Sequence, residues 1–286
     1  MSKSLEIVQT TDGNTEDKAL RLVTQVLNRH YTYSPTLSDL LQSTSELSQQ
    51  SRRQSTSDAC SDTLFAFDTN ALLRLGADSG GADAIDYIRK HPGPLVLPGQ
   101  AIQESWNNLH AGVRTRIKEL SASITQTTKK LEEISEHLEG AIEPAKLAWG
   151  AVADAYKDWI DPAALDSFKQ TIEAINSHTQ SIVAFVPRIE FSPLAEIRKK
   201  TKTPPGFRDD AGNHGDFYLW ADFLYGIAQT SPTSFDRVVM VTNDTKKDWS
   251  TSGAPHPILV SEAISVSGGK KFEIWSREEF VRMANG

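Results

Sequence analysis

The chain has 286 residues, a hydrophobic fraction of 38% and a formal net charge of −7. This length suits one large domain with attachments, and the negative charge disfavours a general electrostatic preference for nucleic acid, although a local basic patch is compatible with it. The single cysteine, Cys60, excludes an internal disulfide and a multi-cysteine zinc site. No apolar run approaches the roughly 18 residues needed to span a bilayer, and the N-terminus lacks a signal-peptide core. We therefore expect a cytoplasmic protein with no membrane partner.

The N-terminal part of the chain differs in composition from the rest. An apolar stripe predicts an amphipathic helix over residues 16–29, and a second, shorter helix is expected over residues 37–47. Residues 48–62 are rich in Ser, Gln and Arg and have the composition of a linker. We expect residues 1–60 to be a helical appendage with a linker, joined to a main domain at residues 61–286.

The main domain alternates apolar strands with helices. Leu64–Phe67 is a buried-strand pattern that ends on Asp68, and Val238–Val241 is a second one, followed by Thr-Asn-Asp. Such alternation predicts an α/β fold with a mostly parallel central sheet. The other predicted elements are strands at 95–97 and 271–275 and helices at 82–90, 215–229 and 277–284.

A long helical segment interrupts this alternation. Apolar residues from Val113 to Leu138 are spaced 4 and 3 apart, as in a coiled-coil seam, and a second seam runs from Leu165 to Ile182. A shorter helical stretch, residues 146–159, joins them. We expect an antiparallel helical arm inserted at about residues 110–187. It is either a packed insertion or a surface for a homodimer or a partner protein.

Four acids stand out by their positions in this pattern. Asp68 and Asp244 end strands, Glu104 lies near the start of the helix after the second strand, and Asp216 opens the helix at 215–229. Carboxyl ends of parallel strands meet at one edge of a sheet, where ligands bind. Carboxylate oxygens select Mg²⁺ or Mn²⁺, and such ions support attack of water on a phosphodiester.

Each acid also has a purely structural interpretation. Asp216 can cap its helix, and Glu104 can serve the helix dipole. Asp68 and Asp244 can be turn residues, although uncompensated carboxylates at the ends of buried strands are costly. Basic residues flank the acids, among them Arg208 before Asp216 and Lys246 after Asp244. They are either a binding surface for a polyanion or solvated surface charge.

Two short motifs carry a family resemblance. Phe67-Asp-Thr-Asn70 and Val241-Thr-Asn-Asp244 resemble the first and last motifs of PIN-domain nucleases. The ordered pieces Pro204–Asp209, Gly215–Trp220 and Asp244–Trp249 narrow it to the PIN-like group with a long helical insertion, the DUF4935 type. The resemblance covers about Leu64 to Met283.

The resemblance implies a three-layer α/β/α fold and metal-dependent cleavage of RNA. It makes Asp68, Glu104, Asp216 and Asp244 the catalytic and metal-binding acids, with Asp209 and Asp248 as further metal ligands. Asn70 and Thr242 would orient the carboxylates or the substrate, and Arg208 and Lys246 would bind the substrate.

We expect a Mg²⁺- or Mn²⁺-dependent endoribonuclease, with a toxin-like or defence effector as one biological setting. The alternative is a non-catalytic PIN-like scaffold that binds protein or nucleic acid through its helical arm. A haloacid-dehalogenase phosphotransferase also starts from an Asp after a strand. It needs a second Asp two residues later, where this chain has Asn70.

Overall fold

The computed structural model describes residues 13–29, 60–77, 79–113, 115–133, 142–156, 162–210, 212–244, 246–251 and 254–286. Its centre is a five-stranded sheet in the order β3-β2-β1-β4-β7, with every neighbouring pair parallel. A short antiparallel ribbon, β5 with β6, follows β4. The strands are β1 (Thr63–Phe67), β2 (Leu95–Pro98), β3 (Ser181–Ala184), β4 (Arg237–Val241), β5 (Ser250–Thr251), β6 (Ala254–Pro255) and β7 (Lys271–Trp275).

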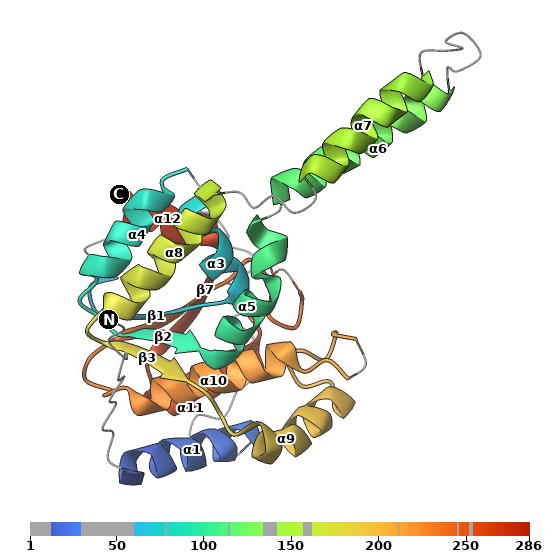
Figure 1. Cartoon of the computed structure of the whole chain (residues 1–286). Coiled ribbons are helices and arrows are strands. Elements are labelled where there is room, and N and C mark those ends of the chain that lie inside the picture. The colour runs from blue at the N-terminus through green and yellow to red at the C-terminus, as the bar shows by residue number, and fades with distance from the viewer. Residues whose placement is uncertain are drawn as a thin grey trace, which may run out of the picture.

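Helices cover both faces of this sheet (Figure 1), which confirms the predicted three-layer α/β/α fold class. One face carries α3 (Thr69–Arg74), η2 (Leu75–Ala77), α4 (Gly81–Lys90), α8 (Pro162–Ser177) and α12 (Arg277–Ala284). The other carries α10 (Gly215–Gln229) and α11 (Pro257–Ser267). Helix α5 (Gly99–Val113) follows β2, and α9 (Arg188–Lys200) follows β3.

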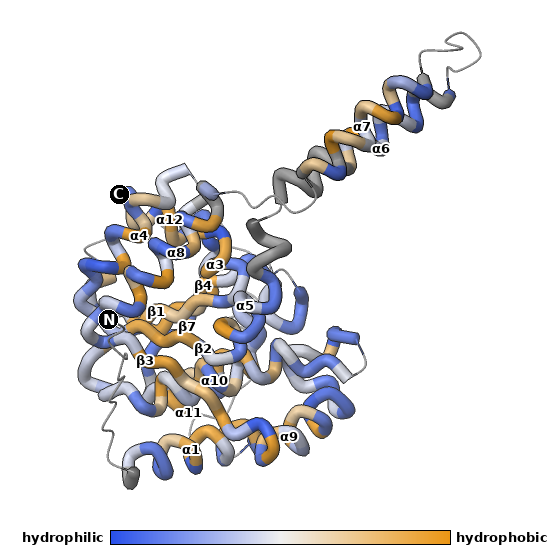
Figure 2. The backbone as a smooth tube through the Cα atoms, in the orientation of Figure 1, coloured by the Kyte–Doolittle hydropathy of each residue, from blue (hydrophilic) through white to orange (hydrophobic). Residues whose placement is uncertain are grey.

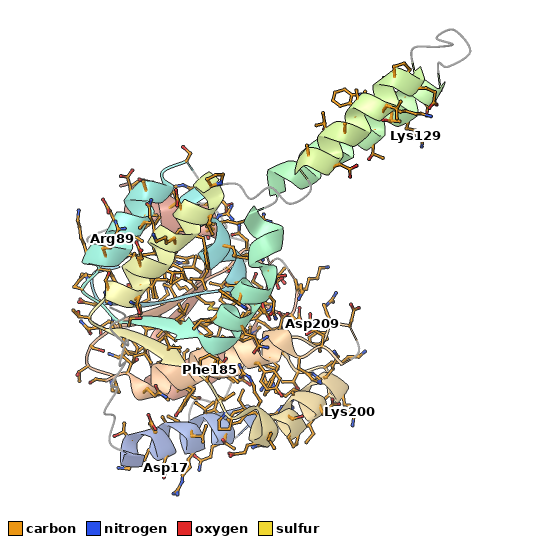
Figure 3. All side chains as sticks on the ribbon, viewed as in Figure 1. Asp17, Arg89, Lys129, Phe185, Lys200 and Asp209 are labelled. Atoms are coloured by element: carbon orange, nitrogen blue, oxygen red, sulfur yellow. The ribbon has the colours of Figure 1, made fainter. Side chains whose placement is uncertain are left out.

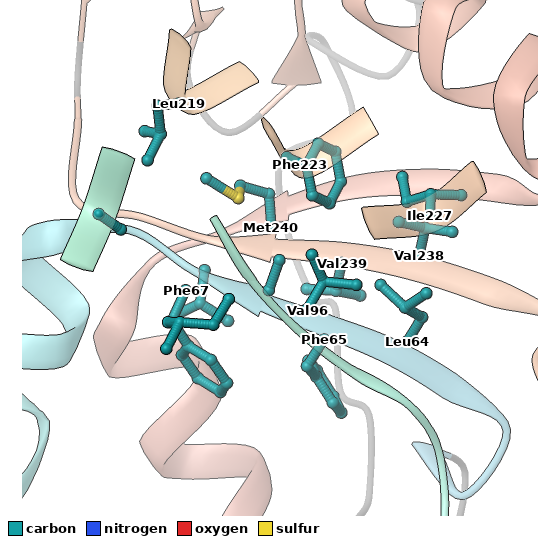
Figure 4. Close-up of a cluster of buried hydrophobic side chains, with 14 of the residues drawn as sticks. Leu64, Phe65, Phe67, Val96, Leu219, Phe223, Ile227, Val238, Val239 and Met240 are labelled. Atoms are coloured by element: carbon teal, nitrogen blue, oxygen red, sulfur yellow. The ribbon is translucent and has the colours of Figure 1, made fainter. Parts of the chain in front are cut away.

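The core lies on both sides of the two central strands, β1 and β4. Phe65 and Phe67 both point toward α12, where each ring centroid is 5.2 Å from that of Phe280. Phe223 and Met240 lie on the opposite side of the sheet (Figure 4). The strands are correspondingly among the most apolar segments of the molecule (Figure 2). Alternating side chains of buried strands thus fill both layers, as the apolar runs predict.

Close approach of α10 to the sheet depends on a glycine. A Cβ atom at Gly226 would lie 2.3 Å from Cγ1 of Val96 in β2, a distance that no side chain tolerates. The glycine therefore permits α10 to pack directly against β2.

The N-terminal helix α1 (Gly13–Leu27) packs against α10 and α11. Val23 and Val26 are buried in this contact, and the Arg29 side chain donates to the Thr203 hydroxyl. The helix therefore contributes to the core of the described body. The predicted second helix at residues 37–47 and most of the predicted linker lie outside the described residues, and the domain division at residue 60 stays a prediction.

The helical arm is built differently from the expectation. Helices α6 (Thr115–Glu133) and α7 (Ile142–Tyr156) lie side by side and project away from the body (Figure 1). The second predicted seam does not join them, because α8 packs against α3 and α4 and buries Ala174 and Ile175 there. The predicted pairing of the two seams is therefore wrong, since an apolar stripe does not specify what covers it.

Residues 178–200 contain a strand, β3, and a helix, α9, that the sequence did not predict. Ile182, the last residue of the predicted seam, lies in the edge strand β3, and α8 already ends at Ser177. Beyond Pro187, α9 forms in spite of Pro193 within it. None of the described helices is both long and apolar enough to cross a membrane.

Candidate functional site

The carboxyl ends of β1 and β4 bring the first and last motifs together. Phe67 pairs with Val241 in the parallel register, so Asp68 and Thr242 leave the sheet side by side. The backbone N–H of Asp68 donates to the carbonyl of Val241 at 3.1 Å. The Thr242 hydroxyl donates to Oδ2 of the Asp68 carboxylate. Two residues that are 174 positions apart in the chain are therefore directly bonded.

Asp68 combines burial with a capping role. Its side chain caps α3, where Oδ1 accepts a hydrogen bond from the backbone N–H of Ala71 at 2.7 Å. Only 5% of the residue is exposed. Burial raises the pKa of the Asp68 carboxyl to about 6, against the opposing hydrogen bonds from Thr242 and Ala71. The negative charges of Asp244 and Glu104 act in the same direction as burial, which places these acids within electrostatic reach.

Glu104 is held by two hydrogen bonds. The Thr69 hydroxyl donates to Oε2 at 2.7 Å, and the side-chain amide of Gln100, one turn earlier in α5, donates to Oε1 at 2.8 Å. A Cβ atom on Gly215, at the start of α10, would lie 2.8 Å from Oε1. Glu104 therefore lies between the end of β1 and the first turn of α10.

Lys246 joins the remaining acids. Its Nζ lies 2.7 Å from Oδ1 of Asp209, 2.7 Å from Oδ2 of Asp216 and 3.4 Å from Oδ2 of Asp244. Burial of the ammonium acts to lower the pKa of Lys246, but the hydrogen bonds to Asp209 and Asp216 outweigh it and raise that pKa. The lysine was predicted to bind substrate, and the structure places it among carboxylates.

A buried acid supports the loop that carries Asp209. The backbone N–H of Gly206 donates to Oδ2 of Asp248 at 2.9 Å, and Asp248 is fully buried. Gly206 has a φ of 87°, and a Cβ atom there would lie 3.1 Å from Cβ of Asp216. Glycine thus permits the loop to turn directly against α10. Oδ1 of Asp248 has no hydrogen-bond partner among the described residues. Asp248, itself a predicted metal ligand, is thus buried and uses its other oxygen to hold the Gly206 backbone.

Trp249 forms a hydrogen bond with Asp216 from the turn after β4. Its indole N–H donates to Oδ2 of Asp216 at 3.1 Å, and the residue is 1% exposed. Its ring lies edge-on to Trp220, with centroids 5.9 Å apart. The turn after β4 is therefore anchored in the core by one of the largest side chains of the molecule.

The sequence interpretation missed an ion pair that fixes the start of α5. Asp222 is fully buried, and its carboxylate accepts hydrogen bonds from the backbone N–H groups of Gln100 and Val186 at 2.7 and 2.8 Å. Arg188 pairs with the same carboxylate at 2.7 Å. Because Gln100 also donates to Glu104, this pair supports one of the predicted catalytic acids. An Asp within the apolar helix 215–229 is the signal that could have revealed it.

Of the other predicted substrate-binding residues, Thr242 is bonded to Asp68, whereas Asn70 and Arg208 have no hydrogen bond to the acids among the described residues. Asn70 is exposed in the first turn of α3, and Arg208 is exposed with its guanidinium 5.8 Å from the Phe207 ring centroid. Asp209 and Lys200 lie on the same side of the molecule, near the first turn of α10 and the end of α9 respectively (Figure 3). Arg208 and Lys200 are thus both exposed.

The donor set suits a hard divalent cation, although its arrangement differs from a preformed site. The described residues contain no group of three or more Asp, Glu, His or Cys side chains with the geometry of a metal centre. The side chains that converge are all carboxylates, namely Asp68, Glu104, Asp209, Asp216 and Asp244. Only one cationic side chain, Lys246, is bonded to this set among the described residues. Oxygen donors with excess negative charge fit Mg²⁺ or Mn²⁺.

Comparison with known proteins gives a match over the part of the chain that contains Asp209, Asp216 and Asp244. Residues 190–258 match a family model described as a PIN like domain. The match covers the loop with Asp209, helix α10 with Asp216, strand β4, and the turn with Asp244 and Lys246. No curated protein and no solved structure matches the chain significantly. The match and the parallel five-stranded sheet flanked by helices support a PIN-like domain with a three-layer fold.

Proposed function

We propose that the protein is a metal-dependent nuclease that hydrolyses RNA phosphodiester bonds at the edge of the sheet where β1 and β4 end. The observation that carries the proposal is that the carboxylates of Glu104 and Asp244 lie close enough to the buried Asp68 for their negative charges to act on it. Carboxylates that repel each other in a buried place need a cation to be stable in their charged form. The partial match to a PIN like domain model supports a nuclease in general terms.

Asp68, Glu104 and Asp244 are the residues that would hold the divalent ion. When bound, such an ion supplies Lewis-acid chemistry at the phosphodiester and makes water a better nucleophile at neutral pH. Thr242, Thr69 and Gln100 hold the carboxylates of Asp68 and Glu104 in place through the hydrogen bonds described above. Partners of this kind preserve the direction of ligand oxygens and tune their basicity.

RNA as the substrate follows from the family resemblance and is supported by the charge around the acids. The protein as a whole is acidic, with a formal net charge of −7, so a polyanion needs local positive charge to approach. Lys200, Lys202 and Arg208 are exposed close to the loop that carries Asp209. A toxin-like or defence role would follow if cleavage inside a cell stops growth.

A second candidate function rests on the helical arm. On α7, Leu147 has 74% of its surface exposed and Trp149 36%. Exposed apolar residues on a projecting helix pair are typical of protein contacts. The chain would then act as a PIN-like scaffold that binds a protein or nucleic acid without cleavage.

A cleavage assay separates these functions. Single-stranded and structured RNA are incubated with the protein and Mg²⁺, Mn²⁺ or EDTA, beside the Asp68→Asn variant and a matched Asp236→Asn control. Asp236 precedes β4 at the opposite edge of the sheet, and its side chain is 79% exposed. We expect cleavage only with a divalent ion, lost in Asp68→Asn and kept in Asp236→Asn. Cleavage that persists in EDTA or in Asp68→Asn would refute the proposed metal-dependent nuclease. RNA that stays intact in every condition would favour the non-catalytic scaffold.

A further inference from the structure

The position of Lys246 is determined by the turn after β4. Oδ1 of Asp244 accepts the backbone N–H of Lys246 at 2.8 Å, and the Thr242 hydroxyl accepts the N–H of Asp244 at 2.9 Å. The carbonyl of Lys246 accepts from the N–H groups of Trp249 and Ser250 at 2.9 and 3.1 Å. The Lys246 backbone is thus tied on both sides, to the end of β4 and to a buried tryptophan.

The side chain of Lys246 is directed into the acid cluster by this turn. Its ammonium bonds Asp209 and Asp216 at hydrogen-bond distance, and Asp244 is 3.4 Å away. The Asp209 side chain is only 4% exposed and that of Asp216 17%. Carboxylates that are so little solvated require a positive partner, because an unpaired buried charge is strongly destabilising. In this structure the partner is Lys246.

The other half of the cluster has no such partner among the residues that the structure describes. Asp68 and Glu104 accept hydrogen bonds from neutral donors, the Thr242 and Thr69 hydroxyls, the Gln100 amide and the N–H of Ala71. The negative charges of Glu104 and Asp244 both act on the Asp68 carboxyl. The cluster therefore divides into a half neutralised by a lysine and a half that keeps its negative charge, with Asp244 between them.

We propose that Lys246 is a built-in cation that occupies the place of one divalent ion, so that the site binds a single metal ion, held by Asp68, Glu104 and Asp244. The proposal rests on the proposed metal-dependent activity and states how the acids are divided. Lys246 acts through Asp209, Asp216 and Asp244, so it is a positioning residue. The ammonium of Lys246 offsets part of the negative charge of Asp209, Asp216 and Asp244 without a second metal ion, because these three carboxylates share it.

A different response of Lys246 to metal is also chemically reasonable. A flexible lysine could leave the carboxylates when metal binds and turn toward a substrate phosphate, and two metal ions would then be held. The number of ions bound by the native protein distinguishes these cases, because it needs no substrate and no activity.

The experiment is a titration of the full-length protein with Mn²⁺, in which free Mn²⁺ is followed by electron paramagnetic resonance. We expect a single ion in the native protein and a second ion in Lys246→Met, where Asp209 and Asp216 lose their cation. Lys246→Arg keeps a cation and is expected to bind a single ion. Adding Asp209→Asn to Lys246→Met is expected to abolish the second ion. Lys90→Met, at the exposed end of α4 and the opposite edge of the sheet, is the matched control for loss of one charge.

Thermal unfolding checks that each variant is folded and adds an independent readout. Lys246→Met is expected to unfold at a lower temperature than the native protein without metal, and to be stabilised by Mn²⁺ more than the native protein or Lys246→Arg is. A merely structural lysine would lower the unfolding temperature without creating a new metal-dependent rise.

Failure of the inference differs from failure of the proposed function. Two ions in the native protein together with metal-dependent RNA cleavage would overturn the inference and leave the function standing. Lys246→Met that is folded and still binds a single ion would do the same. A native protein that binds no Mn²⁺ and leaves RNA intact would overturn the proposed function, and the inference would fall with it.

Discussion

The Thr242 hydroxyl donates a hydrogen bond to the Asp68 carboxylate and, through its oxygen, accepts the backbone N–H of Asp244. One side chain therefore links the acids that end β1 and β4. The parallel register, with Phe67 opposite Val241, is what brings the threonine to this place. The link makes the position of the two acids depend on a residue that need not touch the substrate.

Replacing Thr242 tests this link. Thr242→Val keeps the shape and removes both hydrogen bonds, whereas Thr242→Ser keeps the hydroxyl. Because partners of metal-binding carboxylates typically contribute 10–100-fold in metal affinity or activity, we expect the RNA cleavage rate of Thr242→Val to fall roughly by that factor. Thr242→Ser should retain most of the native rate. Equal rates in the two variants would show that the hydroxyl does not orient the acids.

The raised pKa of Asp68 predicts a pH-dependent effect on stability. Its carboxyl titrates at about 6 in the folded protein, compared with an ordinary value of 3.8, because of burial. The folded state therefore binds this proton more tightly, and the stabilisation it provides is lost as the pH rises through 6. The Asp68→Asn variant has no carboxyl at this position and does not lose stability in this way as the pH rises. Without metal it should therefore be more stable than the native protein by about 3 kcal/mol at about pH 8.

The same comparison at low pH supplies the control. At about pH 3.5 the native carboxyl is protonated in both the folded and unfolded states, and the two proteins should unfold at nearly the same urea concentration. Urea unfolding curves in EDTA at both pH values measure the difference. A gap of equal size at both pH values would contradict the assignment to Asp68 ionisation.

Arg198 predicts a large effect on stability away from the acids. Its buried guanidinium pairs with the fully buried Glu262 at 2.6 Å and donates to the carbonyls of Leu27 and Pro204. It thereby ties α1 and the loop before Asp209 to α11. Removing one partner of a buried pair typically costs about 3–5 kcal/mol, so Arg198→Met should lower the free energy of unfolding by that amount.

Two further variants make the Arg198 prediction specific. Adding Glu262→Leu to Arg198→Met should recover part of the lost free energy, because no unpaired charge is left in the core. Lys200→Met, an exposed neighbour in the same basic run, should change stability by less than about 0.5 kcal/mol. Urea unfolding of the three proteins gives the comparison. A double variant no more stable than Arg198→Met alone would argue against charge burial as the cause.

Much of the α/β body could be predicted from the sequence, because local patterns determine it. Helix α10 and strand β7 have the predicted bounds, residues 215–229 and 271–275, since an apolar run between clear turn signals leaves few alternatives. The meeting of Asp68 with Asp244 followed from the rule that parallel strands share one carboxyl edge. A short strand such as β3 was lost within the adjoining helical pattern, because four residues carry little periodic signal.

The tertiary partners of side chains could not be predicted in the same way. Lys246 lies two residues after an acid in the sequence, which suggested a surface charge near a pocket and gave no hint of Asp209 or Asp216 as its partners. Arg198 opens a basic run, yet it is buried because α1 and α11 cover it. The apolar stripe of α8 resembled that of the arm, and only the fold decided that it faces α3 and α4.

The chemistry at the ends of the cleaved strand distinguishes hydrolysis at a metal ion from attack by the 2′-hydroxyl of the RNA. An RNA oligonucleotide with 2′-deoxy sugars at its potential cleavage sites is incubated with the protein and Mn²⁺ in ¹⁸O-labelled water, and the products are weighed by mass spectrometry. Hydrolysis at a carboxylate-held metal ion needs no 2′-hydroxyl, so we predict cleavage with one labelled oxygen in each new terminal phosphate. Cleavage only where a 2′-hydroxyl is present, with a 2′,3′-cyclic phosphate as product, would contradict the proposed function.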